Sequence, residues 1–455
     1  CMSRRFRFSV RMLLSVTAAV AVVGSLAYAG HLNVGGNRVG GVSIDAEGVV
    51  REPSEDARGL LLEHYRKSIQ NPSPDLAMPT DLRMISLKGL EAAIADARQN
   101  NLGQLPDEVR FLAGLQRIEY VFVYPDRNDI VLAGPGEGWK IRDDATVVGI
   151  TTDRPVMLLD DLIVALRQVE AARQVGISVS IDPTQEGMQR LNEYLAEQRR
   201  RKSPVVPALW EPAMKEAFGP QQVRFTGVPT NSHFARVLLA ADYRMKRLGM
   251  KLDPSPVKGL PSYIDLLNRT RLANNATPRW WLACNYDSVL KSEDGLAWQI
   301  RGQGVKAETE ESFLTKDGQV AGTGKTSGPA KDWADAMTTH YDELSRVDGV
   351  FGELRNLMDM CVVAALIEKH GLLAKAGCSL PLLMNEDSEL AYEKWHAPKL
   401  VAPHCSFVRS RNGWTITASG GVQIESWQVA ENTQTSAELP SARTRATSSG
   451  DSWWW

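Results

Sequence analysis

Short apolar runs alternate with longer stretches in which apolar residues recur every three or four positions. The first pattern is typical of strands and the second of helices with one apolar face. The two patterns follow one another through the middle of the chain, at residues 147–150 (strand), 156–172 (helix), 176–181 (strand), 184–200 (helix), 223–226 (strand) and 233–248 (helix). This βαβα order predicts an α/β layer, in which the strands could be parallel.

Two helix starts have local signatures. Ser86 can cap the helix that follows it, which has apolar residues at helical spacing and a stop at Gly103. Asp182 precedes Pro183 and Gln185, and this order predicts an N-cap for the helix at 184–200.

Polar or glycine turns between short apolar runs predict hairpins at three places. These are residues 42–50, 119–133 and 414–427, and the last one turns at Gly420 and Gly421. The strands at 42–50 are too short to stand alone and need a larger sheet to join.

The region between the second and third hairpins also contains two extended segments and two strong helix patterns. The extended segments are 280–284 and 296–307, and the helices are 329–344 and 351–367. The helix at 351–367 is apolar almost all round, which indicates a central buried helix. Beyond residue 430 the composition is that of a disordered tail, and its Trp453–Trp455 ending has no evident physical role.

The predicted fold class is therefore mixed α/β and α+β, with a βαβα segment in the middle, a helical region after it and a terminal β-hairpin. The predicted organisation is a signal peptide (1–29), a glycine-rich lead and linker (30–82), an α/β unit (83–202), a main α+β domain (203–427) and a disordered tail (428–455).

The first residues have the three parts of a secretory signal. Basic residues 4–11 precede an apolar run at 12–26, and Ala27-Tyr28-Ala29 is a small-x-small site, so cleavage is expected after Ala29. An uncleaved anchor helix is the alternative, but the apolar run is shorter than the ~20 residues that cross a bilayer. We expect an exported protein, periplasmic or extracellular, with no transmembrane segment in the mature chain.

Charge excludes one class of partner. The chain has 52 Lys and Arg against 54 Asp and Glu, and four of the basic residues lie in the predicted signal, which leaves 48 − 54 = −6 for the rest. A mildly acidic body gives no reason to expect nucleic-acid binding. The hydrophobic content of 43% is sufficient for one or more large cores.

Four cysteines follow the predicted signal: Cys284, Cys361, Cys378 and Cys405. In an oxidising compartment they could pair, first Cys378 with Cys405, or all four could be free thiols in a core large enough to need no disulfide. The spacing offers no close ligand pair for zinc, so neither a metal site nor a cofactor is predicted.

The helix at 233–248 carries one group of candidate ligand-binding residues. An apolar stripe leaves a basic and aromatic face with His233, Arg236, Tyr243 and Arg244, which could hold an anion. The helix dipole would favour neutral His233 in the first turn. The alternative is a solvated face supported by an Asp242–Lys246 pair.

Two further pairs are candidates. Arg355 and Asp359 lie four apart in the most apolar helix, so we expect them to form an ion pair. The pair could stabilise the fold or belong to a site. Trp280 and Trp281 could form a sugar-stacking platform, although alternation along a strand would place one of them in the core.

Several segments together resemble a family of uncharacterised exported proteins of planctomycete-type bacteria. The resemblance covers about residues 146–427 and rests on residues 227–247, 278–281, 295–305, 351–367 and 414–422. It implies export and supplies no activity, fold or site residues.

The sequence contains no complete motif for a nucleophile, a catalytic base or a metal. We therefore expect an exported cell-envelope protein of unknown activity that is a binding or structural component, with an envelope partner or a small ligand. An extracytoplasmic hydrolase is the alternative, favoured by the chain's size and by polar groups in apolar surroundings.

Overall fold

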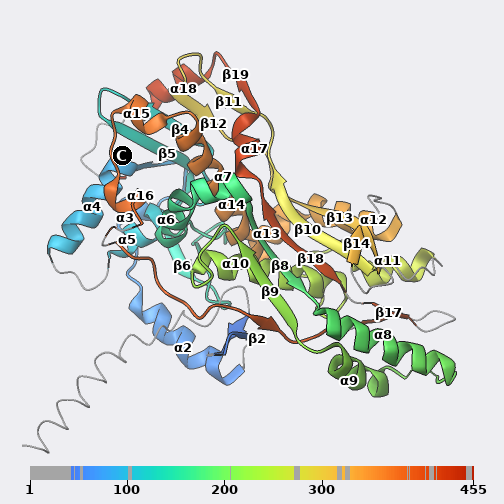
Figure 1. Ribbon diagram of the computed structural model, residues 1–455. Helices are drawn as coiled ribbons and strands as arrows, with labels where there is room; N and C mark the ends of the chain where they lie inside the picture. Colours follow the sequence, from blue (N-terminus) through green and yellow to red (C-terminus); the bar gives the residue numbers. More distant parts are fainter. Residues whose placement is uncertain are drawn as a thin grey trace, which may run out of the picture.

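The computed structural model (Figure 1) describes most of the chain after residue 41. The described ranges are 42–45, 47–51, 55–100, 105–204, 206–270, 277–314, 320–322, 328–386, 388, 390–404, 406–408, 414–416, 418–446 and 453–454. The predicted signal peptide and Cys405 lie outside these ranges.

A nine-stranded mixed sheet forms one side of the molecule. Its strands lie in the order β1 (Ser43–Ile44), β2 (Val49–Arg51), β15 (Leu400–Val401), β9 (Gln221–Thr226), β8 (Ile177–Asp182), β18 (Ser419–Ile424), β10 (Thr277–Asn285), β13 (Gly304–Leu314) and β14 (Val320–Gly322). The β1–β2 hairpin is confirmed, and it joins this sheet through β15.

The second large sheet has six strands, and two small sheets have two strands each. The six strands lie in the order β19 (Thr433–Thr435), β11 (Val289–Lys291), β12 (Ala297–Gln299), β4 (Tyr120–Tyr124), β5 (Asp129–Gly136) and β3 (Thr80–Ser86). The small sheets are β6 (Trp139–Ile141) with β7 (Val147–Gly149), and β16 (Ser406–Val408) with β17 (Trp414–Ile416). The predicted 119–133 hairpin is confirmed as β4 and β5.

The helices pack between and around the sheets. They are α2 (Glu55–Ser68), α3 (Pro74–Ala77), α4 (Leu87–Gln99), α5 (Asp107–Arg110), the short 3-10 turn η1 (Leu112–Gly114), α6 (Leu159–Arg167), α7 (Val169–Val175), α8 (Gln185–Arg200), α9 (Pro207–Phe218), α10 (His233–Gly249), α11 (Tyr263–Thr270), α12 (Gly328–Thr339), α13 (Tyr341–Val347), α14 (Gly349–Lys369), α15 (Leu372–Ala376), α16 (Pro381–Met384), α17 (Ser426–Glu431) and α18 (Leu439–Arg445). This mixture of helices and several sheets confirms the predicted fold class.

Helix α14 is the centre of the core. Every residue from position 349 to position 367 is buried, as the apolar pattern predicts. The helix packs against α6, α10, α13 and α17, and α10 in turn lies on β8 and β18 of the nine-stranded sheet. Ser86 caps α4 as expected, because its hydroxyl accepts a hydrogen bond from the Gly89 N–H.

Two local predictions are wrong, the cap of α8 and the disordered tail, and the strands that could have been parallel are antiparallel. Thr184, not Asp182, caps α8, because Asp182 still belongs to strand β8. Strands β8 and β9 are antiparallel despite the two helices between them. The tail is ordered at 433–446, where β19 pairs with β11 and α18 follows.

The predicted terminal hairpin is also wrong, since β18 runs straight through Gly420 and Gly421. The strand pairs with β10 on one side and β8 on the other. A Cβ at Gly420 would lie 1.7 Å from the Trp280 carbonyl oxygen, and one at Gly421 would lie 1.9 Å from that of Val179. The two glycines therefore permit close strand approach and do not form a turn.

Two further observations concern the whole described chain. Cys284, Cys361 and Cys378 are free thiols, as in the second of the two alternatives that the sequence left open. Within the described ranges, no helix combines the length and the apolar character that a membrane crossing requires.

Candidate functional site

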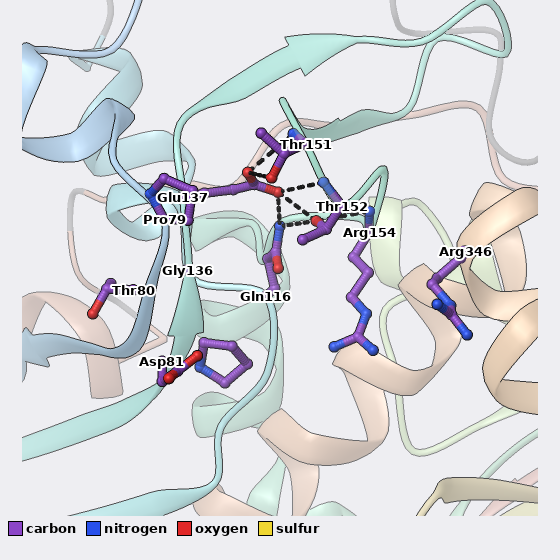
Figure 2. Close-up of a pocket in the computed structure, with 11 residues that line it drawn as sticks. Pro79, Thr80, Asp81, Gln116, Gly136, Glu137, Thr151, Thr152, Arg154 and Arg346 are labelled. Atoms are coloured by element: carbon purple, nitrogen blue, oxygen red, sulfur yellow. Dashed lines mark hydrogen bonds between the residues drawn. The ribbon is translucent and has the colours of Figure 1, made fainter.

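A pocket of about 580 Å³ opens between the ends of β3 and β5 and the loop that follows β7 (Figure 2). Its volume is within the range of small-molecule sites. The lining residues are Pro79, Thr80, Asp81, Gln116, Pro135, Gly136, Glu137, Thr151, Thr152, Arg154 and Arg346.

The buried carboxylate of Glu137 holds one wall of this pocket in place. It accepts hydrogen bonds from the backbone N–H of Thr151 (3.0 Å) and of Thr152 (2.9 Å). The hydroxyls of both threonines and the side-chain amide of Gln116 (3.0 Å) also donate to it. These five hydrogen bonds tie Glu137 to Thr151 and Thr152 and so position the loop that leads to Arg154.

A glycine makes space for this carboxylate. A Cβ at Gly149, the last residue of β7, would lie 2.0 Å from Glu137 Oε1 and 2.1 Å from Gln116 Nε2. Burial by itself raises the pKa of Glu137, but the hydrogen bonds from Thr151 and Thr152 outweigh burial and lower the pKa to about 2. Glu137 is therefore ionised and acts as a positioning residue.

Two arginines line the side of the pocket that lies opposite Asp81. Figure 2 shows the guanidinium groups of Arg154 and Arg346 on one side and the Asp81 carboxylate on the other. Arg346 Nη2 lies 3.0 Å from Asp342 Oδ2, and Arg154 Nη2 lies 3.8 Å from Asp342 Oδ1. A third arginine, Arg355, lies 3.0 Å from Asp342 Oδ1.

One carboxylate thus faces three guanidinium groups. The arginines lower the pKa of Asp342, against the opposing effect of burial. Arg154 and Arg346 remain 28% and 45% exposed, so their charges are accessible from the pocket. This wall can accept an anionic group, and Asp81 across the pocket can accept a hydrogen bond from the same molecule.

A second polar cluster surrounds His233, at the start of α10. Its Nδ1 lies 2.9 Å from Asp161 Oδ2 on α6, and both side chains are buried. Burial lowers the pKa of His233, but the charge and hydrogen bond of Asp161 outweigh burial and raise it to about 9. The helix dipole was expected to favour neutral His233, but the neighbouring Asp161 carboxylate has the larger effect.

Glu353 of α14 belongs to the same cluster. It is only 8% exposed, and its Oε2 has no hydrogen-bond partner among the described residues. Burial raises the pKa of Glu353 to about 7, although the charge of His233 opposes this effect.

The chain around Trp395 covers this cluster. The Trp395 ring lies 5.5 Å from the His233 ring, and the guanidinium carbon of Arg236 lies 4.3 Å from the Trp395 centroid. Arg236 also donates to the His396 carbonyl at 3.1 Å.

The expected Arg355–Asp359 ion pair is not formed, because each side chain has a different partner. Asp359 accepts two hydrogen bonds from Arg117, at 2.7 and 3.0 Å, and one from the Tyr286 hydroxyl at 2.7 Å. Arg355 pairs instead with Asp342 beside the pocket, and it does not share a cluster with His233.

The solvated face expected for α10 is also wrong, because this helix is buried on nearly all sides. Arg244 pairs with Asp348 and Asp253, and the Tyr243 hydroxyl lies 3.0 Å from His404 Nε2. The Asp242–Lys246 pair exists at 2.8 Å but is buried.

The two tryptophans of β10 separate as strand alternation predicts. Trp280 is buried, with its ring 4.3 Å from that of Trp333 and 5.2 Å from that of Tyr263. Trp281 is partly exposed and lies 5.3 Å from the guanidinium carbon of Arg279. The two rings do not form one platform.

The pocket residues Glu137, Arg154 and Arg346 were not among the sequence candidates. Arg346 is far from the other two in sequence, and each residue is unremarkable alone. One signal was available: Glu137 lies within the run Gly134-Pro135-Gly136-Glu137-Gly138, and closely spaced glycines indicate close backbone packing.

Among the described residues, no three His, Cys, Asp or Glu side chains are grouped so that they could hold a metal ion. A family model described as a protein of unknown function, DUF1598, matches residues 179–263, from β8 into α11. No curated protein and no solved structure matches the chain.

Proposed function

We propose that this chain is an exported binding protein of the cell envelope, and that the pocket between Asp81 and Arg154 binds a small organic anion. The observation that carries the proposal is the arginine wall, where the partly exposed guanidinium groups of Arg154 and Arg346 line the pocket and share the Asp342 carboxylate with the buried Arg355. An anionic group of the ligand would face Arg154 and Arg346, and a hydroxyl or amino group would donate to Asp81. Charge-assisted hydrogen bonds of this kind are the strong ones in ligand sites.

The proposed ligand class can be tested with pairs of small anions that differ in one donor group. Calorimetric titration would compare succinate with malate and methyl phosphate with glycerol 3-phosphate, with glycerol as the neutral control. We expect binding of the anions only, and tighter binding of the hydroxylated member of each pair. The proposal fails if none of the four anions binds, or if glycerol binds as well as they do.

Substitutions of pocket residues test whether an anion that binds the protein binds in this pocket. Arg154→Ala removes a guanidinium from the wall and should weaken binding at least tenfold, since a hydrogen bond to a charged group contributes about 1.5–3 kcal/mol. Asp81→Asn should reduce only the preference for the hydroxylated anion. Arg173→Ala is the matched control, because Arg173 is 61% exposed and lies on α7, away from the pocket lining. Unchanged affinity in Arg154→Ala would place the ligand elsewhere.

Export is supported by the basic, apolar and small-residue segments of residues 1–29 and by the resemblance to exported proteins of planctomycete-type bacteria. Expression in a bacterium, followed by fractionation and N-terminal sequencing, tests it. We expect a mature chain that begins at Gly30 in the periplasm or medium. An intact N-terminus in the cytoplasm would contradict export.

An extracytoplasmic hydrolase is the second candidate function. It is favoured by the buried His233–Asp161 pair, because a histidine that a carboxylate orients and keeps protonated can serve as a general acid. If hydrolysis of model esters or amides is detected, His233→Gln should abolish it while leaving the protein folded. Activity that survives this substitution would exclude His233 as the catalytic acid.

A further inference from the structure

Helices α8 and α9 form a hairpin at the edge of the molecule, in the lower right of Figure 1. The hairpin has a small core of its own, made of Met188 and Leu191 from α8 and Met214 and Phe218 from α9. This core lies near the base of the hairpin, where α8 leaves β8 and α9 enters β9. Residues at the turn between the helices can therefore change without disturbing it.

The turn between the two helices carries a dense positive charge. Arg199, Arg200, Arg201 and Lys202 are consecutive and all exposed. Arg200 and Arg201 both pair with Glu197, which is the only acidic residue among residues 197–210. Four cations against one carboxylate leave a surplus of three positive charges at the turn.

Apolar side chains are exposed beside these cations. Leu209 is 72% exposed and Val206 is 41% exposed, and they are two of the six large hydrophobic residues that are exposed in the described chain. Both lie at the start of α9, whose first residue is Pro207. The cations and the apolar side chains thus share one end of the hairpin.

This combination selects one kind of partner. A nucleic acid or an acidic protein segment would bind the cations but would leave Val206 and Leu209 without a role. A membrane of anionic phospholipids provides both, because its surface is negatively charged and the boundary between headgroups and acyl chains accepts aliphatic side chains.

We propose that the α8–α9 tip, which consists of residues 199–202 with Val206 and Leu209, docks the protein on an anionic phospholipid surface. The cations pair with headgroup phosphates, and the two aliphatic side chains enter the headgroup boundary. The surface is independent of the pocket, so this docking does not depend on the proposed ligand.

Vesicle sedimentation tests the proposal on the chain that begins at Gly30, since the apolar run at 12–26 would itself bind lipid. We expect the protein to bind vesicles of phosphatidylcholine mixed with phosphatidylglycerol, and not vesicles of pure phosphatidylcholine. Raising the ionic strength from about 0.05 M to about 0.5 M should release it, because salt screens exposed charges. Equal binding to both vesicles would overturn the proposal.

Substitutions separate the contribution of the tip cations to vesicle binding from that of the exposed apolar side chains. Arg200→Glu/Arg201→Glu should lower the partition coefficient at least 25-fold, since each cation near an anionic membrane contributes about fivefold. The control Lys67→Glu/Lys331→Glu makes the same charge change at two exposed i,i+4 pairs on other helices and should change the partition much less. Equal loss in the two double variants would show an effect of net charge and contradict docking through the tip.

Leu209→Ser tests the apolar contact and should weaken vesicle binding severalfold, whereas Val175→Ser, at another exposed site, should not. If Leu209→Ser binds vesicles as the unchanged protein does, while the tip cations are needed equally for binding to vesicles and to heparin, the tip is an electrostatic site for acidic polymers. That outcome would overturn the assignment to lipid. Circular dichroism confirms that each variant is folded.

Discussion

Glu353 and Arg355 are two positions apart on α14, yet their side chains belong to separate polar clusters. A helix turns by about 200° over two residues, so the two side chains leave opposite sides. Glu353 interacts electrostatically with His233, while Arg355 pairs with Asp342 beside the pocket. One central helix therefore supports two sites that can be tested independently.

The His233–Asp161 pair should make stability depend on pH in the alkaline range. The pKa of His233 is raised from 6.5 to about 9 in the folded state, so its contribution is complete below pH 6.5 and is lost as the pH rises through 9. We expect His233→Gln to lower the free energy of unfolding by about 1–3 kcal/mol at pH 6. The variant should also lose less stability than the unchanged protein as the pH rises from 6.5 to 9. Urea denaturation across this range measures both effects.

His404 is the matched control, because its pKa is shifted in the opposite direction. Burial, together with the charge of Arg247, lowers the pKa of His404 to about 4. The unfolded chain then binds the extra proton, so stability falls as the pH drops from 6.5 through 4. His404→Gln should remove that loss of stability at acid pH. It should leave the pH dependence of stability between pH 6.5 and 9 unchanged. If His404→Gln also flattens the alkaline range, the assignment to His233 is wrong.

Glu137 should stabilise the protein above its ordinary pKa. Because the folded pKa is lowered from 4.5 to about 2, the stabilisation is complete above pH 4.5 and is lost as the pH falls through 2. We expect Glu137→Gln to lower the free energy of unfolding by about 2 kcal/mol at pH 6 and by much less near pH 2. Equal losses at both pH values would show that the carboxylate charge is not what the five donors stabilise.

The sequence predicted the elements whose signals are local. The helical spacing of residues 233–248 and the apolar character of 351–367 identified α10 and α14, and the turn at 125–128 identified the β4–β5 hairpin. Strand order was not predictable in this way, because it depends on pairing between distant residues. Gly420 and Gly421 show why: a glycine pair has the same local signal in a turn and in a strand under close contact.

The candidate site was predictable only in part. His233 was identified because it lies at the start of an amphipathic helix, but its partner Asp161 lies 72 positions earlier and has no local sign of that role. Arg355 was identified by its apolar surroundings and assigned the wrong partner, since spacing on one helix says nothing of Asp342 on another. The pocket wall at Arg154 depends on the close approach of Glu137 to Gly149, which no local pattern in the sequence indicates.

Gly421 should tolerate no side chain. A Cβ there would lie 1.9 Å from the Val179 carbonyl oxygen and 2.7 Å from the Trp281 ring, so β8 and β18 would have to separate. We expect Gly421→Ala to destabilise the protein by about 3 kcal/mol or more, measured as the free energy of unfolding in urea. Gly371→Ala, where nothing lies within 4 Å of the added Cβ and the backbone is left-handed helical (φ 60°, ψ 39°), should cost about 1 kcal/mol from its positive φ alone. Similar values for the two variants would show that the strands adjust.

Asp359 should be the polar residue of α14 whose loss is most damaging. It is completely buried, and it holds Arg117, which is itself only 11% exposed. Asp359→Asn leaves the Arg117 guanidinium buried without its counter-charge, and breaking a buried ion pair in this way costs about 3–5 kcal/mol. Tyr286→Phe is the control, because it removes one hydrogen bond to the same carboxylate and should cost only about 1 kcal/mol. The double variant Arg117→Met/Asp359→Leu should recover part of the loss, since no buried charge is left unpaired. If Asp359→Asn costs no more than Tyr286→Phe, then water or another group neutralises Arg117, and the pair is not the electrostatic link between α14 and the chain before β4.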